Sequence, residues 1–251
     1  MKLAKRILFA SLLAATALSV SSCYVKLSEE AKKAINIRIA SSRKIYSESD
    51  SLVVFPGEFR GICNNGPVDV DFIVREGDPE VVIKGTHATR DSVKVLVDKG
   101  NGLLTIMMSG PIAQDEHVTV YAPTIKVIEA RGSGDLMIHE GLSDEYLLVN
   151  KSGSGDTMIV GCETIGMVSV DKEGSGDLTI QIVNSGSVSI SCSGSGDTVL
   201  KGKTGELTLK KDGSGSFYSG DLDAERVIVQ RVSGSGEVAY REGGEVKSAT
   251  N

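Results

Sequence analysis

Apolar side chains recur at every second position of short segments from residue 51 onward, which is the period of β-strands. In one such segment, Val68, Val70 and Phe72 alternate with Asp69 and Asp71. This region lacks the 3.6-residue spacing of an amphipathic helix. The alternation therefore predicts an all-β chain.

The segments fall into an irregular group and a regular group. Between residues 51 and 124 they are unevenly spaced, and we expect irregular strands that cap the fold. Within residues 125–242 the tripeptide Gly-Ser-Gly returns six times, with serines 21, 21, 20, 19 and 21 residues apart. These serines are Ser133, Ser154, Ser175, Ser195, Ser214 and Ser235. A fixed period near 20 residues is typical of a solenoid, in which each repeat is one turn stacked on the last.

The alternation also predicts which side chains point inward. Leu136 and Ile138 follow the first Gly-Ser-Gly corner, Leu147 and Val149 precede the second, and most equivalent residues of the other turns are aliphatic. Stacking the turns about 4.8 Å apart would place these residues in buried files, which defines a parallel β-helix. The intervening positions, such as Met137, should face outward.

Three lysines precede corners, and we place them on the outside as well. Lys151, Lys172 and Lys211 lie near the acidic residues of the corners in sequence. We expect them to form an outward, charge-balanced Lys/Asp face that repeats from turn to turn.

Backbone geometry explains why glycine recurs at the corners. Glycine adopts dihedrals that a Cβ would obstruct, and it allows stacked backbones to approach closely. The twelve predicted structural corners are Gly132, Gly134, Gly153, Gly155, Gly174, Gly176, Gly194, Gly196, Gly213, Gly215, Gly234 and Gly236.

An acidic or hydroxyl residue follows each corner. It is aspartate in four successive turns (Asp135, Asp156, Asp177 and Asp197) and then Ser216 and Glu237. Carboxylates one strand spacing apart repel each other unless a cation bridges them, so this file is a candidate Ca²⁺ site. We favour the alternative that they are solvated turn residues accepting amide hydrogens, because the Gly-Gly-x-Gly-x-Asp nonapeptide of Ca²⁺-binding β-rolls is missing from the sequence. No cofactor is expected.

The start of the chain predicts export and lipidation. Residues 1–22 contain Lys2, Lys5 and Arg6 and then an apolar run, as a signal peptide does. The small residues directly before Cys23 resemble a bacterial lipobox, so we expect Cys23 to be lipidated and the protein to be anchored in the cell envelope, at the outer membrane, without spanning it. The folded part then faces either the periplasm or the cell surface. The alternative is an ordinary signal peptide with a free cysteine nearby.

Residues 23–50 read as a polar tether and residues 243–251 as a tail.

The charge of the chain argues against one class of partner. After removal of residues 1–22, 24 basic and 33 acidic side chains remain, so the formal net charge is −9. The basic residues are not clustered, which argues against a nucleic-acid partner.

The remaining cysteines do not suggest a disulfide. Cys63, Cys162 and Cys192 are an odd number, and the last two fall at different positions of the repeat. We expect buried thiols that pack as small hydrophobic groups.

The lipoprotein signal, the irregular β start and the repeated Gly-Ser-Gly-Asp corners, ending at Gly234-Ser235-Gly236-Glu237, together resemble the putative auto-transporter adhesin, head GIN domain family of bacterial envelope proteins. The resemblance covers residues 52–240. It implies a right-handed parallel β-helix on the cell envelope with a role in adhesion, and it brings no catalytic residues. Ser216 departs from the aspartate pattern.

One local feature is a candidate contact patch. Phe217 and Tyr218 follow the fifth corner, with Tyr240 one turn later. By the alternation, Phe217 points inward and Tyr218 outward, so a core aromatic beside an exposed neighbour is the favoured interpretation, and a small binding patch is the functional one.

The sequence indicates a non-catalytic, lipid-anchored adhesin or interaction scaffold, with a glycan or protein at the cell surface as partner. The alternatives are a polysaccharide-acting β-helix enzyme, such as a lyase or pectinase, and a purely structural envelope protein. Such enzymes need convergent acids and bases, whereas His87, His117 and His139 are scattered and Trp is absent. We expect no catalytic residues.

Overall fold

The computed structural model describes residues 43–46, 51–110 and 116–249. Over these residues the chain is nearly all β-strand and forms a β-solenoid of about five turns with roughly 21 residues per turn. The predicted all-β solenoid is therefore confirmed. The signal peptide, Cys23 and most of the expected tether lie outside the described residues.

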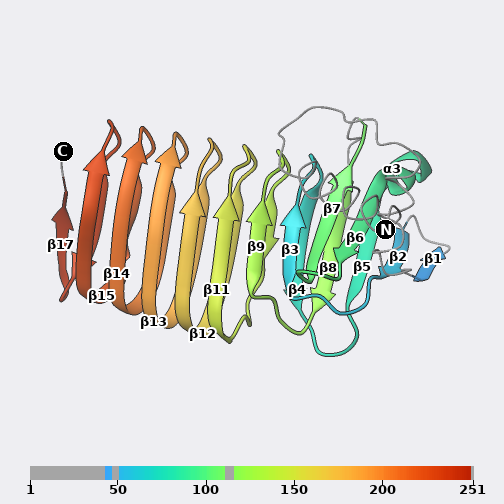
Figure 1. The fold of residues 1–251 in the computed structure, drawn as a ribbon, viewed down its shortest axis with the longest axis horizontal. Helices are drawn as coiled ribbons and strands as arrows, with labels where there is room; N and C mark the ends of the chain where they lie inside the picture. Colours follow the sequence, from blue (N-terminus) through green and yellow to red (C-terminus); the bar gives the residue numbers. More distant parts are fainter. Residues whose placement is uncertain (1–42, 47–50, 111–115, 250–251) are drawn as a thin grey trace, which may run out of the picture. The chain divides into compact units, whose positions relative to one another are not determined.

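The regular part of the solenoid is a stack of parallel strands that stay in register from turn to turn (Figure 1). Thr157 pairs with Leu178, Leu178 with Thr198, and Thr198 with Phe217. Each long strand bends, so its first half lies in one face of the solenoid and its second half in the opposite face. The strands are β10 (Leu136–Ile138), β11 (Asp144–Lys151), β12 (Thr157–Lys172), β13 (Leu178–Gly194), β14 (Thr198–Gly213), β15 (Phe217–Ser233) and β16 (Val238–Glu242).

The turn before this stack comes from a distant part of the chain. β3 (Gly61–Asn64) pairs in parallel with β9 (Val127–Ala130), and β4 (Asp69–Val74) pairs in parallel with β10. Residues 75–126 leave the stack between these two turns and return to it.

That excursion closes one end of the stack. β7 (Leu103–Met108) and β8 (His117–Ala122) run parallel to β3 and β4 and add one more turn on their far side. β6 (Val93–Asp98) and β5 (Glu80–Lys84) then pair antiparallel with them, β2 (Ser51–Phe55) pairs with β5, and β1 (Arg43–Tyr46) pairs with β2. Because the strand direction reverses here, the parallel ladder does not continue past this end.

Three elements differ from the sequence expectations, and one of them is β17 (Glu245–Ser248), a strand within residues 243–251, which we expected to be a tail. The short helix α3 (His87–Ser92) lies in the excursion, although its six residues are too few to show a helical period. β1 lies within residues 23–50, which we expected to be a polar tether, so the end of that segment adds a strand to the cap.

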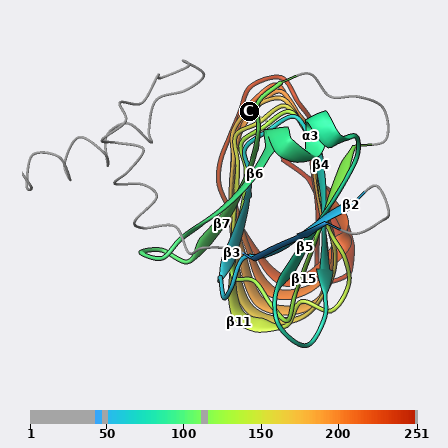
Figure 2. The same cartoon turned by 90° about the vertical axis from the view of Figure 1, so that its right-hand side faces the viewer.

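The core consists of files of aliphatic side chains that run the length of the stack. Leu147, Val168, Val188 and Leu207 form one file in successive turns, and each is 0 % exposed. Figure 2 looks along the stack and shows successive turns superimposed. Burying each such side chain contributes about 1.5–3 kcal/mol before the loss of chain entropy is counted. The predicted inward files are confirmed.

At the other end, β17 (Glu245–Ser248) folds back antiparallel onto β16. No helix among the described residues is both long enough and apolar enough to cross a bilayer.

Candidate functional site

The Gly-Ser-Gly corners stack on one another, as predicted. A Cβ added to Gly155, Gly176 or Gly215 would come closer to the carbonyl oxygen of the preceding corner than real Cβ atoms ever do. The first glycine of several corners also has a positive φ, for example 92° at Gly174 and 115° at Gly194. Close approach therefore requires glycine throughout this edge, and the backbone conformation requires it at some positions as well.

The aspartates after the corners form a hydrogen-bonded ladder. Oδ1 of Asp135 accepts the backbone N–H of Asp156 at 2.7 Å, and Oδ1 of Asp156 accepts that of Asp177 at 2.8 Å. The same contact continues from Asp177 to Asp197 and from Asp197 to Ser216. Each carboxylate thus satisfies an amide of the following turn, which is the turn role that we favoured over metal binding.

The ladder begins one turn earlier than the sequence suggests. Oδ1 of Asp69 accepts the N–H of Asp135 at 2.8 Å, and Gly66 lies directly against Gly132. This first corner reads Asn-Gly-Pro-Val-Asp, so a search for Gly-Ser-Gly misses it. The described residues contain no group of three or more His, Cys, Asp or Glu side chains placed to hold a metal ion.

The lysines before the corners point inward, so the expected outward Lys/Asp face is wrong. Lys151, Lys172 and Lys211 are each only 1 % exposed. They share one inward file with Ala130 and Cys192. The long apolar stem of lysine fills the interior beneath the corner, and this is why the position tolerates it.

Each buried ammonium group donates to carbonyl oxygens of the glycine corners. Nζ of Lys151 bonds the carbonyls of Gly153 and Gly155, and Nζ of Lys211 lies 3.0 Å from the carbonyl of Gly213. The first turn uses an amide in the same file, because Nδ2 of Asn64 lies 3.0 Å from the carbonyl oxygen of Val68. The file therefore supplies donors to backbone acceptors that face the interior.

Burial lowers the pKa of Lys151 and Lys172, because desolvation disfavours the charged form. For Lys151, the neighbouring ammonium of Lys172 lowers the pKa further, while the ladder carboxylates Asp156, Asp135 and Asp177 raise it. The carboxylates of the ladder outside the corner and the ammonium groups inside it therefore attract each other electrostatically across the backbone. This arrangement supports the corners.

The predicted aromatic patch is not brought together. Phe217 is 0 % exposed and belongs to the core, and Tyr240 is half-buried against the core. Only Tyr218 is exposed, at 37 %. It lies in a longer outward file with Met137, Met158, Thr179 and Val199, of which Met158 is 44 % exposed. Each member is one residue past an inward position, so the alternation alone could have revealed this stripe.

Two histidines that are far apart in sequence meet at one carboxylate. Nε2 of His117 lies 2.8 Å from Oδ2 of Asp71, and Nε2 of His139 lies 3.4 Å from Oδ1 of the same residue. Parallel pairing of β4 with β8 and with β10 brings them together. These histidines are scattered along the sequence, and their spacing does not show which strands become neighbours.

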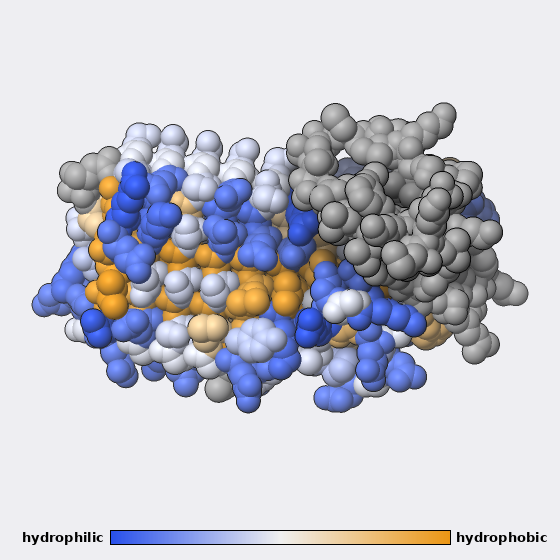
Figure 3. Space-filling model, in the orientation of Figure 1, coloured by the Kyte–Doolittle hydropathy of each residue, from blue (hydrophilic) through white to orange (hydrophobic). Residues whose placement is uncertain are grey.

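The face formed by the second halves of the long strands carries a row of small hydroxyl side chains. Ser169, Ser189 and Thr208 stack in register along its middle. Figure 3 shows this face, with pale residues in a row, hydrophobic residues visible between them, and charged residues along both margins. Figure 3 shows no deep hollow over the part of this face that β12 to β15 form.

The three described cysteines are free thiols, as predicted. Burial raises the pKa of Cys63 and of Cys162 to about 12 and also raises that of Cys192. Thiols held in the protonated form are poor nucleophiles. They act as packing groups.

The glycine corners, the aspartate ladder and the buried lysines define the class of protein. It is a parallel β-solenoid in which acidic and basic side chains hold the corners. The chain belongs to the family described as "Putative auto-transporter adhesin, head GIN domain", which matches residues 58–250. No curated protein matches the sequence.

Several solved structures share the fold. A putative adhesin from Parabacteroides merdae is 17 % identical with a TM-score of 0.60, and the match covers 74 % of this chain and 75 % of that one. A putative lipid binding protein from Parabacteroides distasonis is 18 % identical with a TM-score of 0.55 and coverages of 74 % and 76 %. A putative adhesin from Bacteroides fragilis is 17 % identical with a TM-score of 0.58 and coverages of 78 % and 96 %.

Proposed function

We propose that this protein is a non-catalytic, lipid-anchored adhesin of the bacterial cell envelope. The observation that carries the proposal is the way the solenoid uses its charged groups. The ladder carboxylates accept backbone amides once per turn, and the buried ammonium groups donate to corner carbonyls. Such groups build a long scaffold, and membership of an adhesin family supports a role in attachment.

The polysaccharide-acting enzyme is the weaker alternative. Glycoside cleavage needs two carboxyl groups on either side of the scissile bond, or a base beside a clustered acid. In the described residues the lysines nearest the ladder are buried, so they cannot reach a sugar in solution. The face of Ser169, Ser189 and Thr208 also shows no deep hollow that would exclude water (Figure 3).

Anchoring rests on the start of the sequence. A basic segment, a short apolar run and small residues before Cys23 favour lipidation, and a lipid chain holds a folded domain at a membrane without a spanning helix. The positions of the two ends of the described chain support this proposal. The described chain enters at the capped end through β1 and finishes at the opposite end, so a tether at the N-terminus would present the far end outward (Figure 1).

Two measurements test the proposal. Metabolic labelling with a radioactive fatty acid should mark the full chain, and Cys23→Ala should abolish the label and release the protein from the membrane fraction. A glycan and extracellular-matrix array should show binding by the mature chain, while a panel of plant and host polysaccharides should release no reducing ends or unsaturated sugars. Product release from any of them would contradict the non-catalytic role, and unchanged labelling of Cys23→Ala would contradict the anchor.

A further inference from the structure

The two ends of the solenoid are built differently. At the N-terminal end, β5, β6, β2 and β1 run antiparallel over the outermost turn and terminate the parallel ladder. At the C-terminal end, β16 covers only the first half of β15, through Phe217–Ser219 and Asp223–Ala224. Among the described residues, no strand pairs with the outer side of residues 226–233. The second half of β15 is therefore an open edge.

The apolar inner file is uncovered at this edge. Leu207 and Leu209 of β14 are each 0 % exposed, whereas their partners in the last turn, Val227 and Val229, are half-buried. In the file of buried lysines, the last member is Val232, which is also half-buried. One further strand would cover these side chains as β15 covers those of β14.

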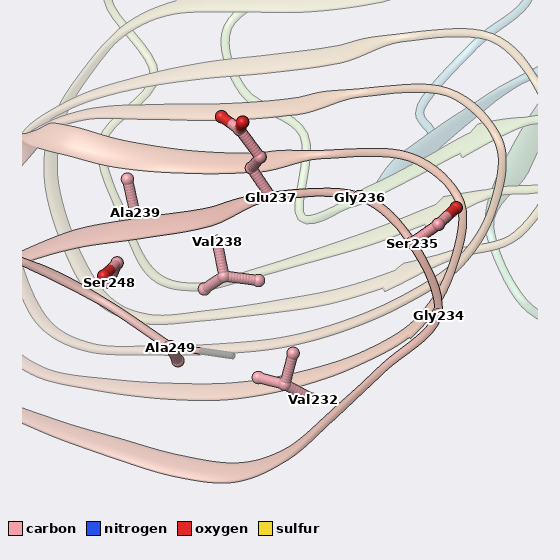
Figure 4. A pocket seen from close by; sticks show the side chains of 9 residues that line it. All are labelled: Val232, Gly234, Ser235, Gly236, Glu237, Val238, Ala239, Ser248 and Ala249. Atoms are coloured by element: carbon pink, nitrogen blue, oxygen red, sulfur yellow. The ribbon is translucent and has the colours of Figure 1, made fainter. Parts of the chain in front are cut away.

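A hollow lies beside the open edge. It has a volume of about 440 Å³, and Figure 4 shows the side chains of Val232, Val238 and Ala249 around it, with the last glycine corner along its rim. An unpaired strand edge next to an apolar hollow is the arrangement that accepts a strand from another chain.

The backbone at the start of the edge is held in place by the hairpin that follows. Oε1 of Glu242 accepts the N–H of Val227 at 2.8 Å, and Nζ of Lys247 holds the other carboxylate oxygen at 2.7 Å. The first outward amide of the edge is thus satisfied within the chain. The register shift between Val229 and Arg231 then limits the regular part of the edge to a few residues around Val229.

Charge does not oppose contact between two copies at this end. Residues 222–248 contain four basic and five acidic side chains, a formal net charge of −1, whereas the mature chain has −9. The two arginines of the edge are already paired, Arg226 with Glu206 and Arg231 with Asp212. Most of the repulsive charge therefore lies elsewhere on the molecule.

We propose that the open C-terminal end is a homophilic contact, at which the open ends of two copies on facing cells meet about a two-fold axis. A two-fold axis makes the strands of the two edges antiparallel and brings the two apolar hollows opposite each other. This inference rests on the proposed adhesin function, because it requires an N-terminal anchor that presents the open end outward.

A contact of this kind is weak for one pair of molecules and strong for an array. One short edge and one hollow form a small interface, but many copies on each surface raise the effective concentration of every further contact. The contact is therefore best measured between surfaces that carry many copies.

The experiment uses the mature chain on beads of two colours. One set is coupled through the N-terminus, which leaves the open end free, and a second set is coupled through the C-terminus, which buries that end against the bead. We expect mixed-colour clusters from the first set and at least tenfold fewer from the second. This comparison needs no mutation, so it does not depend on a variant that folds.

A variant pair locates the contact. Val229→Asp places a carboxylate in the uncovered inner file and should reduce clustering at least tenfold, whereas Ser169→Asp on the same face but in the middle of the stack should leave it unchanged. Circular dichroism checks that both variants are folded. Equal clustering by both coupling directions, or no clustering by either, would overturn the homophilic contact. If beads that fail to cluster still bind the glycan or matrix array, the adhesin function stands and only the homophilic contact is lost.

Discussion

The ammonium nitrogen of Lys172 lies 2.5 Å from the carbonyl oxygen of Gly196, which belongs to the next glycine corner along the stack. Lys172 is 1 % exposed, so one buried positive charge links two successive turns from the inside. Outside the same corners, the aspartate ladder links turns through backbone amides. The corner column is therefore held from both sides of the backbone.

We expect Lys172→Ala to destabilise the protein by about 2–4 kcal/mol. The substitution removes a long side chain from the interior and leaves the carbonyl of Gly196 without its donor. Urea unfolding followed by circular dichroism measures the change. Lys203→Ala is the matched control, because Lys203 is exposed, and it should shift stability by no more than about 0.5 kcal/mol. Equal midpoints for the two variants would show that Lys172 does not support the stack.

The buried lysines also predict a pH dependence. Burial lowers the pKa of Lys151 and Lys172 below the unfolded value of 10.5, so near and below that value the unfolded chain binds more protons than the folded chain. The cost of burying these charges is fully present below the folded pKa and disappears as the pH rises to 10.5. Their contribution to stability should therefore increase with pH in this window.

Measuring that contribution requires a difference between two proteins. The raised pKa values of Cys63 and Cys162, about 12 against 9.0 when unfolded, act in the opposite direction, because they make stability fall as the pH rises above 9. Lys172→Met keeps the apolar stem and the cysteines. The free energy of unfolding of the natural protein minus that of Lys172→Met should rise between pH 8 and pH 10.5, and a flat difference would contradict the lowered pKa.

A corner glycine should not tolerate alanine. The Cβ of Gly176→Ala would overlap the carbonyl of Gly155 and lie 2.6 Å from Nζ of Lys151, so we expect a loss of about 3 kcal/mol. Gly220→Ala is the control, because nothing lies within 4 Å of a Cβ there. Thermal unfolding should show a clear drop in Tm for the first variant only; similar values for both would mean that the corners are packed less tightly than described.

The aspartate ladder should depend on its oxygen atoms more than on its charge. Asp156→Asn keeps an acceptor for the N–H of Asp177 and should be nearly neutral, whereas Asp156→Ala removes the acceptor and should cost about 1 kcal/mol. Asp171→Ala, at an exposed position on the opposite face, serves as the control. An equal loss for Asp156→Asn and Asp156→Ala would instead indicate that the charge, through the buried ammonium groups, dominates.

The repeat period and the inward aliphatic files were predictable from the sequence, because Gly-Ser-Gly and the alternation around it recur at nearly constant intervals. The direction of Lys151, Lys172 and Lys211 was predicted wrongly, although Cys192 shares their position in the repeat and already indicated an inward site. The charge of a lysine favours an outward direction, whereas its place in the alternation determines the direction here. A buried lysine is acceptable here because glycine corners turn their carbonyls toward its ammonium group.

Relationships between distant segments could not be predicted. The corner at Gly66 and Asp69 lacks the Gly-Ser-Gly signature, and residues 75–126 separate it from the next turn. The contacts of Asp71 with His117 and His139 follow from the same insertion, because β4 lies between β8 and β10 only after residues 75–126 have folded back. Local pattern predicts which strands exist, but it does not predict which strands become neighbours.

Distances between spin labels on the exposed corner serines test the stacked architecture most directly. Labels at Ser133 and Ser175, Ser133 and Ser214, and Ser133 and Ser235 span two, four and five turns, in a background with Cys63, Cys162 and Cys192 replaced. Pulsed electron resonance should show the mean separation growing by about 4.8 Å for each added turn. Separations that do not increase in step with the number of turns would contradict the solenoid and every interpretation based on it.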